Sequence, residues 1–413
     1  MTETPPPPSP ARPSRLPSAV LWFGVVSFLT DAASEMIYPL LPLFLTSVLA
    51  APVTVIGAIE GVAEATAALF KLISGRIADA MPRKKPLVVA GYGLAALVRP
   101  LVSIATTWWQ VLLIRFSDRV GKGIRSSPRD AIVAEATPIG QRGAAFGYHR
   151  SMDNAGAVLG PLLGYALWQG AGLELRTMFA WAAVPGLLAL VALIFGVREP
   201  VAPPASDAAK QQKLVPIPPS ERRALVRYLT AVAVFSLGNS SDAFLLVRAG
   251  QILHPGDSLG KAVLADPKVL LLWTLHNAVK ALLSKSAGGL SDRLGRRRLI
   301  AAGWALYAVT YVAFGLADRP WQIWALFAVY GLYYSLVEGA EKALVADLAG
   351  PGRKGRAFGW FHGTVGIMAL PASFLFGLIY NQWGALAAFS VSAVLAGVAS
   401  LLLARVPAPS PTP

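Results

Sequence analysis

Four acidic residues in two apolar stretches have the spacing of a proton-binding site. Asp31 and Glu35 are four residues apart, and Glu60 and Glu64 repeat that spacing in the next apolar stretch. In a helix, residues four apart share a face and lie about 6 Å apart along the axis. Neighbouring carboxylates hinder one another's ionisation, which suits proton uptake and release. The alternative is structural, because buried acids also form ion pairs that hold helices together.

A second set of charges follows helical spacing between residues 108 and 134. Its members are Arg115, Asp118, Arg119, Lys122, Arg125 and Arg129. At 100° per residue these side chains form one polar stripe along the whole helix, and such a stripe cannot face lipid. Because arginine suits bidentate recognition of carboxylates and phosphates, the stripe predicts an anionic or zwitterionic substrate. Alternatively, the cations only neutralise the four carboxylates named above.

The remaining titratable candidates are few. His149 and Asp153 lie on the apolar stretch 144–168, where the histidine could titrate near neutral pH or be a satisfied polar group. Asp242 and Glu338 are the candidate counter-charges from the second half of the chain. The sequence has no cysteine, no metal-ligand spacing and no Ser/His/Asp signature. We therefore predict no metal, no cofactor and no enzymatic activity.

The composition places these charges in a membrane protein. The chain has 413 residues, of which 55% are hydrophobic and only 14% charged, whereas soluble domains carry about 25% charged residues. Its mean hydropathy is +0.54. Apolar stretches of about 20 residues are long enough to cross a bilayer. We place twelve spans at 20–47, 54–78, 87–106, 108–134, 144–168, 177–197, 224–249, 268–290, 299–317, 321–347, 357–380 and 384–404.

The net charge of +15 does not indicate a nucleic-acid partner. Lys and Arg residues gather in the connections after spans 2, 4, 8 and 10, whereas the connections after spans 1, 3 and 11 carry none. This asymmetry predicts an inner (cytoplasmic) cell membrane protein with both termini in the cytoplasm. We expect a disordered Pro-rich tail at 1–18, a six-helix bundle at 19–197, a cytoplasmic linker at 198–223, a second six-helix bundle at 224–405 and a tail at 406–413.

The two halves of the chain repeat one another. Residues 75–85 read G-x-x-x-D, a short turn and a basic cluster, and residues 288–298 read the same. Ala145-Phe146-Gly147 recurs 212 positions later as Ala357-Phe358-Gly359. Six spans return the chain to its starting side, so the repeats are parallel and related by an axis along the membrane normal.

On these motifs the chain resembles the major facilitator superfamily (MFS) over essentially its whole membrane part. Its second basic loop matches the family pattern G-x-x-x-D-R-x-G-R-R nearly completely, whereas the first has Ala80 in place of the Arg and Pro82 in place of the Gly. Residues 118–130 resemble a bacterial and archaeal group with the motif DRxGKGIRxxPRD. The resemblance implies an all-α membrane protein with twelve transmembrane helices in two parallel-repeat six-helix bundles. It also implies a central cavity that five charged residues can reach: Asp31, Glu35, Arg115, Arg119 and Lys122.

The resemblance further implies a charge latch at the cytoplasmic ends of the helices in each half. In the first half, the expected members are Asp79, Arg83 and either Arg129 or Asp130. In the second half, they are Asp292 with the adjacent Arg293, Arg296 and either Glu341 or Asp347. The expected role of both latches is gating.

A glycine ladder marks the fifth span. The run Gly156-x-x-x-Gly160-Pro161-x-x-Gly164 resembles motif C of MFS antiporters, which is associated with efflux. Glycines at this spacing also make a smooth face for close helix packing, and the proline bends the helix by removing a backbone hydrogen bond. Generic packing of small residues is the alternative interpretation.

These features predict a secondary transporter that works by alternating access, with proton-coupled export (antiport) of a small molecule as the preferred mode. Symport or uptake of a polar organic anion is the runner-up. A lipid flippase or membrane-embedded enzyme is a further class, although an enzyme should show a nucleophile or metal cluster. A receptor would carry an appended soluble domain, for which the linker is too short. The expected partners are the bilayer, the substrate and protons, with the protein a monomer.

Overall fold

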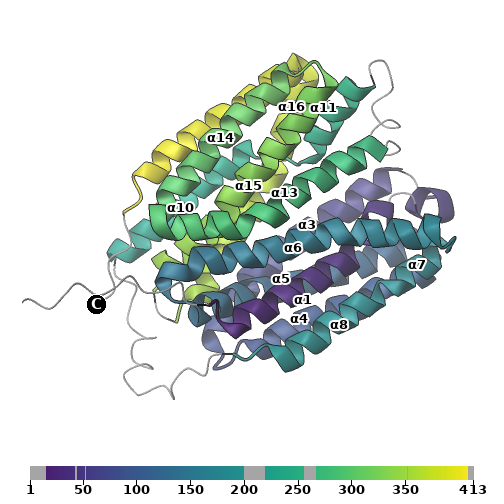
Figure 1. Ribbon diagram of the computed structural model, residues 1–413, viewed down its shortest axis with the longest axis horizontal. Helices are drawn as coiled ribbons and strands as arrows, with labels where there is room; N and C mark the ends of the chain where they lie inside the picture. Colours follow the sequence, from purple (N-terminus) through teal and green to yellow (C-terminus); the bar gives the residue numbers. More distant parts are fainter. Residues whose placement is uncertain are drawn as a thin grey trace, which may run out of the picture.

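The computed structural model describes residues 15–41, 44–51, 53–199, 219–254, 267–350 and 352–407. Within these ranges the regular secondary structure is entirely helical. The helices form two bundles that lie side by side (Figure 1). The first bundle holds the helices up to α8, and the second holds those from α10 onward.

The first bundle follows the predicted spans closely. Its elements are α1 (Ser18–Glu35), η1 (Tyr38–Leu40), η2 (Phe44–Val48), α3 (Val53–Ala80), α4 (Lys85–Val98), η3 (Arg99–Ile104), α5 (Trp108–Ala136), η4 (Ile139–Gln141), α6 (Arg142–Tyr165), η5 (Ala166–Gly170), α7 (Leu175–Trp181) and α8 (Ala183–Gly196). The labels η mark short 3₁₀ or π turns that extend or join the longer helices.

The second bundle repeats this order. Its elements are α10 (Pro219–Gly238), α11 (Ala243–Leu253), α13 (Pro267–Leu294), α14 (Arg296–Leu316), α15 (Pro320–Leu348) and α16 (Lys354–Ala404). Helix α16 covers the last two predicted spans, and it is interrupted at Gly384, whose φ of 82° is a left-handed value. Glycine adopts that conformation without a steric penalty, so the chain can turn there and return.

The internal repeat extends to the helix caps. The side-chain oxygen of Gln110 accepts hydrogen bonds from the backbone N–H groups of Thr106 and Thr107, at 2.7 and 3.2 Å, before the start of α5. Gln322 repeats this arrangement at the start of α15, at 2.8 and 2.9 Å. Such caps satisfy N–H groups that have no partner within the helix. The two glutamines are 212 positions apart, the separation already seen in the sequence repeat.

In the described part of the chain, seven helical segments are long and apolar enough to cross a membrane. Helix α5 is not among them, and it carries eight Asp, Glu, Lys and Arg residues within its 29 positions. Its charges are nevertheless buried, since Arg115, Asp118 and Arg125 are only 5%, 0% and 4% exposed. The polar stripe of α5 therefore faces neighbouring helices rather than lipid, as its spacing predicts.

The two bundles meet along glycine-lined contacts. Helix α6 packs along α13 (Figure 1), and α3 packs along α16. A Cβ added to Gly288 would lie 2.0 Å from the carbonyl oxygen of Gly143, and one added to Gly75 would lie 2.3 Å from that of Gly355. Only glycine permits so close an approach of two backbones. These contacts lie near the end of the molecule that carries the basic loops around 83–85 and 296–298, which we call the basic end.

Replacing Gly288 with alanine should loosen the contact between the bundles. We expect Gly288→Ala to destabilise the protein by roughly 1–3 kcal/mol, the usual cost of overpacking. Its neighbour is a matched control: a Cβ at Gly289 meets nothing within 4 Å, so Gly289→Ala should gain up to about 1 kcal/mol from helix propensity. Thermal unfolding of the two purified variants compares them, and equal shifts would contradict the close packing.

Candidate functional site

Asp118 is the centre of a buried cluster in the first bundle. Its carboxylate accepts hydrogen bonds from Arg99 Nε and from the Tyr38 hydroxyl, each at 2.7 Å, and lies 3.8 Å from the Arg115 guanidinium. Arg115 also stacks on the Tyr38 ring, 3.6 Å from its centroid, and Arg99 donates to the carbonyl of Thr30 at 2.9 Å. Asp118 therefore ties η1, η3 and α5 together.

Asp31 and Glu35 have a different environment on α1. Both are half-buried, and neither carboxylate forms a hydrogen bond or an ion pair with another described residue. The positive charge of Lys122 on α5 acts on both of them. Lys122 is itself half-buried and forms no ion pair within the described ranges. These three charges therefore act on one another without a direct ion pair among the described residues.

The glycine ladder of α6 packs against the turn of α1 that carries these acids. A Cβ added to Gly156 would lie 3.1 Å from the Cβ of Asp31, and one added to Gly160 would lie 2.7 Å from that of Glu35. Gly164 continues the contact, since a Cβ added to it would lie 3.1 Å from the carbonyl oxygen of Met36. Pro161 lies inside α6 beside these glycines. The ladder lets α6 pack directly against the two acidic residues. A change in the conformation or protonation of either acid would therefore alter the contact between α1 and α6.

Glu64 on α3 completes this part of the site. Its carboxylate lies 3.7 Å from Arg119, and its side chain is 60% exposed, so the pair is accessible to solvent or a ligand. Arg119 is 8% exposed and lies 5.6 Å from the Tyr38 ring centroid. The side chain of Glu60 lies outside the described residues, so its predicted role stays a prediction.

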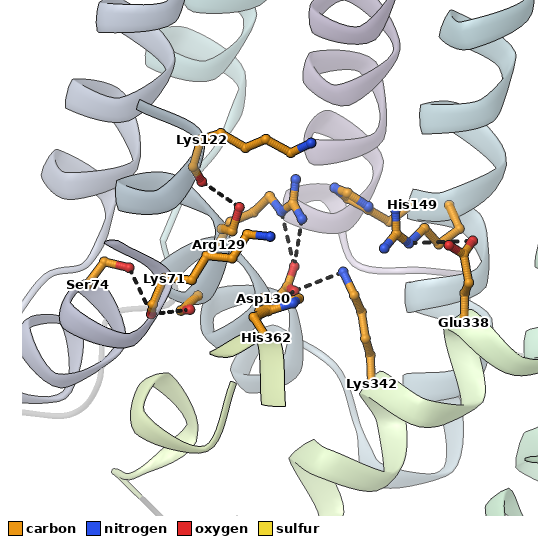
Figure 2. Close-up of polar contacts among 12 residues, drawn as sticks. Lys71, Ser74, Lys122, Arg129, Asp130, His149, Glu338, Lys342 and His362 are labelled. Carbon is orange, nitrogen blue, oxygen red and sulfur yellow. Dashed lines mark hydrogen bonds and ion pairs between the residues drawn. The ribbon is translucent and has the colours of Figure 1, made fainter. Parts of the chain in front are cut away.

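A buried ion cluster joins the two bundles at Asp130. Its carboxylate lies 2.8 Å from Lys342 Nζ of α15, 2.9 Å from His362 Nε2 of α16 and 3.0 Å from Arg129. Figure 2 shows Lys342 and His362 approaching Asp130 from the second bundle. The Asp130 and Lys342 side chains are only 1% and 3% exposed. Arg129 and Asp130 were expected to join Asp79. That expectation is wrong, because Arg129 binds Asp130 and Tyr92 of its own bundle, and Asp130 pairs with Lys342 and His362 of the other.

A second polar contact between the bundles involves α6. Arg150 lies 3.7 Å from Glu338 of α15 and 3.2 Å from Asp153 of its own helix. Asp153 also lies 3.4 Å from His149 and accepts a short hydrogen bond from Ser27 of α1. His149 and Asp153 are therefore members of one buried network, in which His149 Nδ1 has no hydrogen-bond partner among the described residues. Glu338 contacts the first bundle through Arg150.

Asp79 and Asp292 each bind the start of a helix in the opposite bundle. Asp79 accepts hydrogen bonds from the backbone N–H groups of Gly355 and Arg356, both at 2.8 Å, at the start of α16. Asp292 accepts them from Gly143 and Ala144, at 3.0 and 2.8 Å, at the start of α6. A helix N-terminus carries unpaired N–H groups and a partial positive charge, so it binds a carboxylate well. The two contacts are equivalent under the repeat, and we call them the two aspartate latches.

The side chains around the second latch decide between the two acids, Glu341 and Asp347, that the sequence left open. Arg296 pairs with Asp292 and lies 3.1 Å from Asp347, which Arg142 of the first bundle also reaches at 2.7 Å. Asp347 is thus the partner rather than Glu341, whose carboxylate instead accepts a hydrogen bond from Trp304 at 3.2 Å.

Arg83 and Arg293 are exposed and form no ion pair among the described residues, so their expected place in the latches is wrong. Asp242 also differs from expectation: its partner is the Tyr330 hydroxyl in its own bundle, at 2.6 Å. Tyr330 is fully buried among aromatic rings.

Sequence reasoning missed Lys342, His362 and Arg142 as functional candidates. One signal could have found the first of them. Asp130 and Lys342 are 212 positions apart, so they are equivalent positions of the repeat that carry opposite charges. Equivalent positions meet only close to the axis that relates the two halves. Phe146 and Phe358 are also 212 apart, and their ring centroids lie 5.7 Å from each other.

The two parallel bundles, the charged face of α5 and the closed basic end together define a membrane transporter. The family model of the Major Facilitator Superfamily matches residues 23–265 and 269–413, and the chain belongs to that family. The predicted all-α fold of two six-helix bundles is confirmed.

Known proteins of the family match almost the whole chain. An uncharacterised MFS-type transporter of Methanocaldococcus jannaschii is 32% identical over 384 residues, covering 93% of this chain and 94% of the relative. Multidrug resistance protein MdtG of Enterobacter lignolyticus is 25% identical over 331 residues, covering 79% and 75%. The crystal structure of the human organic anion transporter MFSD10 superposes with a TM-score of 0.72 at 17% identity, covering 94% and 99%. This last likeness shows the fold alone.

Removing Asp130 should cost more stability than removing its partner Lys342. Asp130→Asn leaves Lys342 buried without a counter-charge, which typically costs 3–5 kcal/mol. Lys342→Met should cost less, because Asp130 keeps Arg129 and His362. Unfolding of the two purified variants in detergent shows which substitution lowers the stability more. A larger loss for Lys342→Met would contradict the central place of Asp130.

Proposed function

We propose that the protein is a proton-coupled exporter of a small polar molecule, an antiporter that works by alternating access. The observation that carries the proposal is the pair Asp31 and Glu35, two half-buried carboxylates without ion-pair partners among the described residues. An ionised group in a membrane interior costs several kcal/mol unless it is paired or meets water. These acids are therefore stable when protonated or when a cation or substrate group faces them, which is the behaviour that coupling requires.

The substrate proposed is anionic or zwitterionic. Lys122 acts electrostatically on both acids without an ion pair of its own among the described residues, whereas Arg119 acts on Glu35 and pairs with the accessible Glu64. When protons neutralise Asp31 and Glu35, the positive charge of Lys122 is left without compensation and attracts an anion. When the protons leave, the acids compete for the same cations. Proton binding and substrate binding are thereby linked through one set of charges.

The contacts at the basic end supply the gate. Both aspartate latches and the Asp130 cluster join the two bundles within about ten residues of the basic ends of their helices. Alternating access requires these contacts to break in every cycle. By the positive-inside rule the basic end faces the cytoplasm, as do both termini, in an inner membrane. The state described here is then closed to the cytoplasm.

Export is the direction favoured by two observations. The glycine ladder of α6 presses on the proposed proton-binding acids, and relatives such as MdtG are named multidrug resistance proteins. Uptake of an organic anion by symport is the second candidate, because the cation-rich face of α5 suits an anion moving in either direction. The direction of the proton gradient that drives transport separates the two.

Replacing the two acids should uncouple transport from protons. A thermal-shift screen of organic acids, amino acids and cationic drugs first identifies a ligand, since one present at 100 times its Kd adds about 2.7 kcal/mol to stability. In proteoliposomes, an outward-directed flux of that ligand should then be driven by an opposing proton gradient. In Asp31→Asn and Glu35→Gln this dependence on the gradient should vanish, while exchange of labelled for unlabelled ligand continues.

Glu174→Gln provides the control, because Glu174 is an exposed acid at the start of α7. It should keep the full response to the gradient. An unchanged response in both acid variants would contradict the role of Asp31 and Glu35 in coupling. Flux in the same direction as the protons would replace antiport by the symport alternative.

A further inference from the structure

A cavity of about 320 Å³ opens at the basic end of the second bundle. It lies between the first turns of α10 and α16 and the last residues of α15. Three arginines line it, namely Arg222, Arg353 and Arg356, and none of its lining residues is acidic. This cavity is separate from the charges of the proposed transport site, which belong to α1, α3 and α5.

The cavity is ordered by polarity along the helices. On α10, Arg222 comes first, Val226 lies one turn deeper and Leu229 two turns deeper. On α16, Arg353 comes at the start and Trp360 lies two turns deeper. Seven residues of helix span about 10 Å, so a cationic rim lies about 10 Å outside an apolar wall on both helices. Tryptophan at such a boundary is typical of the membrane interface.

Arg353 and Arg356 have no cationic counterpart in the first bundle, although Arg356 also lies 4.0 Å from the Asp79 carboxylate. The first bundle provides the comparison, because the positions equivalent to Arg353 and Arg356 under the 212-residue repeat are Gln141 and Ala144. The same backbone is therefore built without cations at these two positions. A fourth cation lies beside the inner part of the cavity, since the Arg76 guanidinium of the other bundle is 5.7 Å from the Trp360 ring centroid.

We infer that this cavity binds the headgroup of an anionic phospholipid, with the first segments of an acyl chain along its apolar wall. Basic pockets between membrane helices bind such headgroups, and arginine holds phosphate oxygens in bidentate fashion. A free phosphate compound would use the arginines but leave Val226, Leu229 and Trp360 without a role. The linker 201–218 is a poor occupant on charge, because it carries Lys210 and Lys213 against the single acid Asp207. The inference does not depend on which solute is transported.

Native mass spectrometry of the purified full-length protein tests the site by titration with dioleoyl phosphatidylglycerol or dioleoyl phosphatidylcholine. We expect phosphatidylglycerol to bind at least tenfold more tightly. Arg222→Gln should weaken its binding about fivefold, the usual contribution of one cation at an anionic lipid. Val226→Trp keeps every charge but fills the cavity, and it should weaken binding at least as much. Arg227→Gln is the matched control, because Arg227 lies on the same helix outside the cavity and should leave the affinity unchanged.

Each other occupant gives a distinct result that would overturn the inference. Equal binding of the two lipids, or equal effects of Arg222→Gln and Arg227→Gln, would show that the cavity does not select an anionic headgroup. Displacement of phosphatidylglycerol by millimolar inorganic phosphate or glycerol 3-phosphate would assign it to a soluble anion. The chain has no cysteine, so a disulfide that formed between Val226→Cys and Leu214→Cys would place the linker there instead.

Discussion

A carboxylate placed at the N-terminus of a helix from the opposite bundle is the contact on which the closed basic end depends. Asp79 makes it at α16, and Asp292 makes it at α6. The carboxylate satisfies two N–H groups that the helix cannot pair internally, and it meets the positive end of the helix dipole. The aspartate can reach only if the helices pass almost in backbone contact, which is why glycines line both crossings. In the repeated G-x-x-x-D motif, the glycine therefore permits the close crossing of the helices, and the aspartate makes the hydrogen bonds to the opposite helix N-terminus.

The repeat also explains the charges at the centre of the interface. In a true two-fold assembly, a residue on the axis meets its own copy, and a buried charge there would face a like charge. A duplicated chain can place opposite charges at equivalent positions, and Asp130 with Lys342 does so at 2.8 Å. Arg142 and Lys354, also equivalent, donate to the carbonyls of Ala346 and Ala134 in the opposite bundles. The interface thus keeps the symmetry of its backbone contacts while its central ion pair is asymmetric.

Helical spacing predicted much of this architecture, because it fixes which face of a helix a residue occupies. The burial of the α5 stripe and the close packing of the glycine ladder follow from spacing alone. Spacing does not fix which neighbouring helix meets that face, so the partners of Asp130 were missed and the choice between Asp347 and Glu341 stayed open. Asp79 and Asp292 were expected in the latches, but their partners were missed for another reason: the donors are backbone N–H groups, which leave no trace in a pattern of side chains. Asp118 and Asp31 are both acids within predicted spans, and the positions of Arg99, Tyr38 and Arg115 distinguish the paired acid from the unpaired one.

Closure of the basic end by the two aspartates is tested most directly by a distance measured across it. Spin labels at Arg83→Cys and Arg293→Cys report on the two bundles, since both positions are exposed and the chain has no other cysteine. Because a carboxylate at a helix N-terminus typically contributes roughly 0.5–1 kcal/mol, removing both in Asp79→Asn with Asp292→Asn should cost about 1–2 kcal/mol and raise the longer-distance population about 5- to 30-fold. Asp318→Asn, an exposed acid away from the basic end, should leave the distribution unchanged. An identical distance distribution with and without the two aspartates would contradict their role in holding the bundles together.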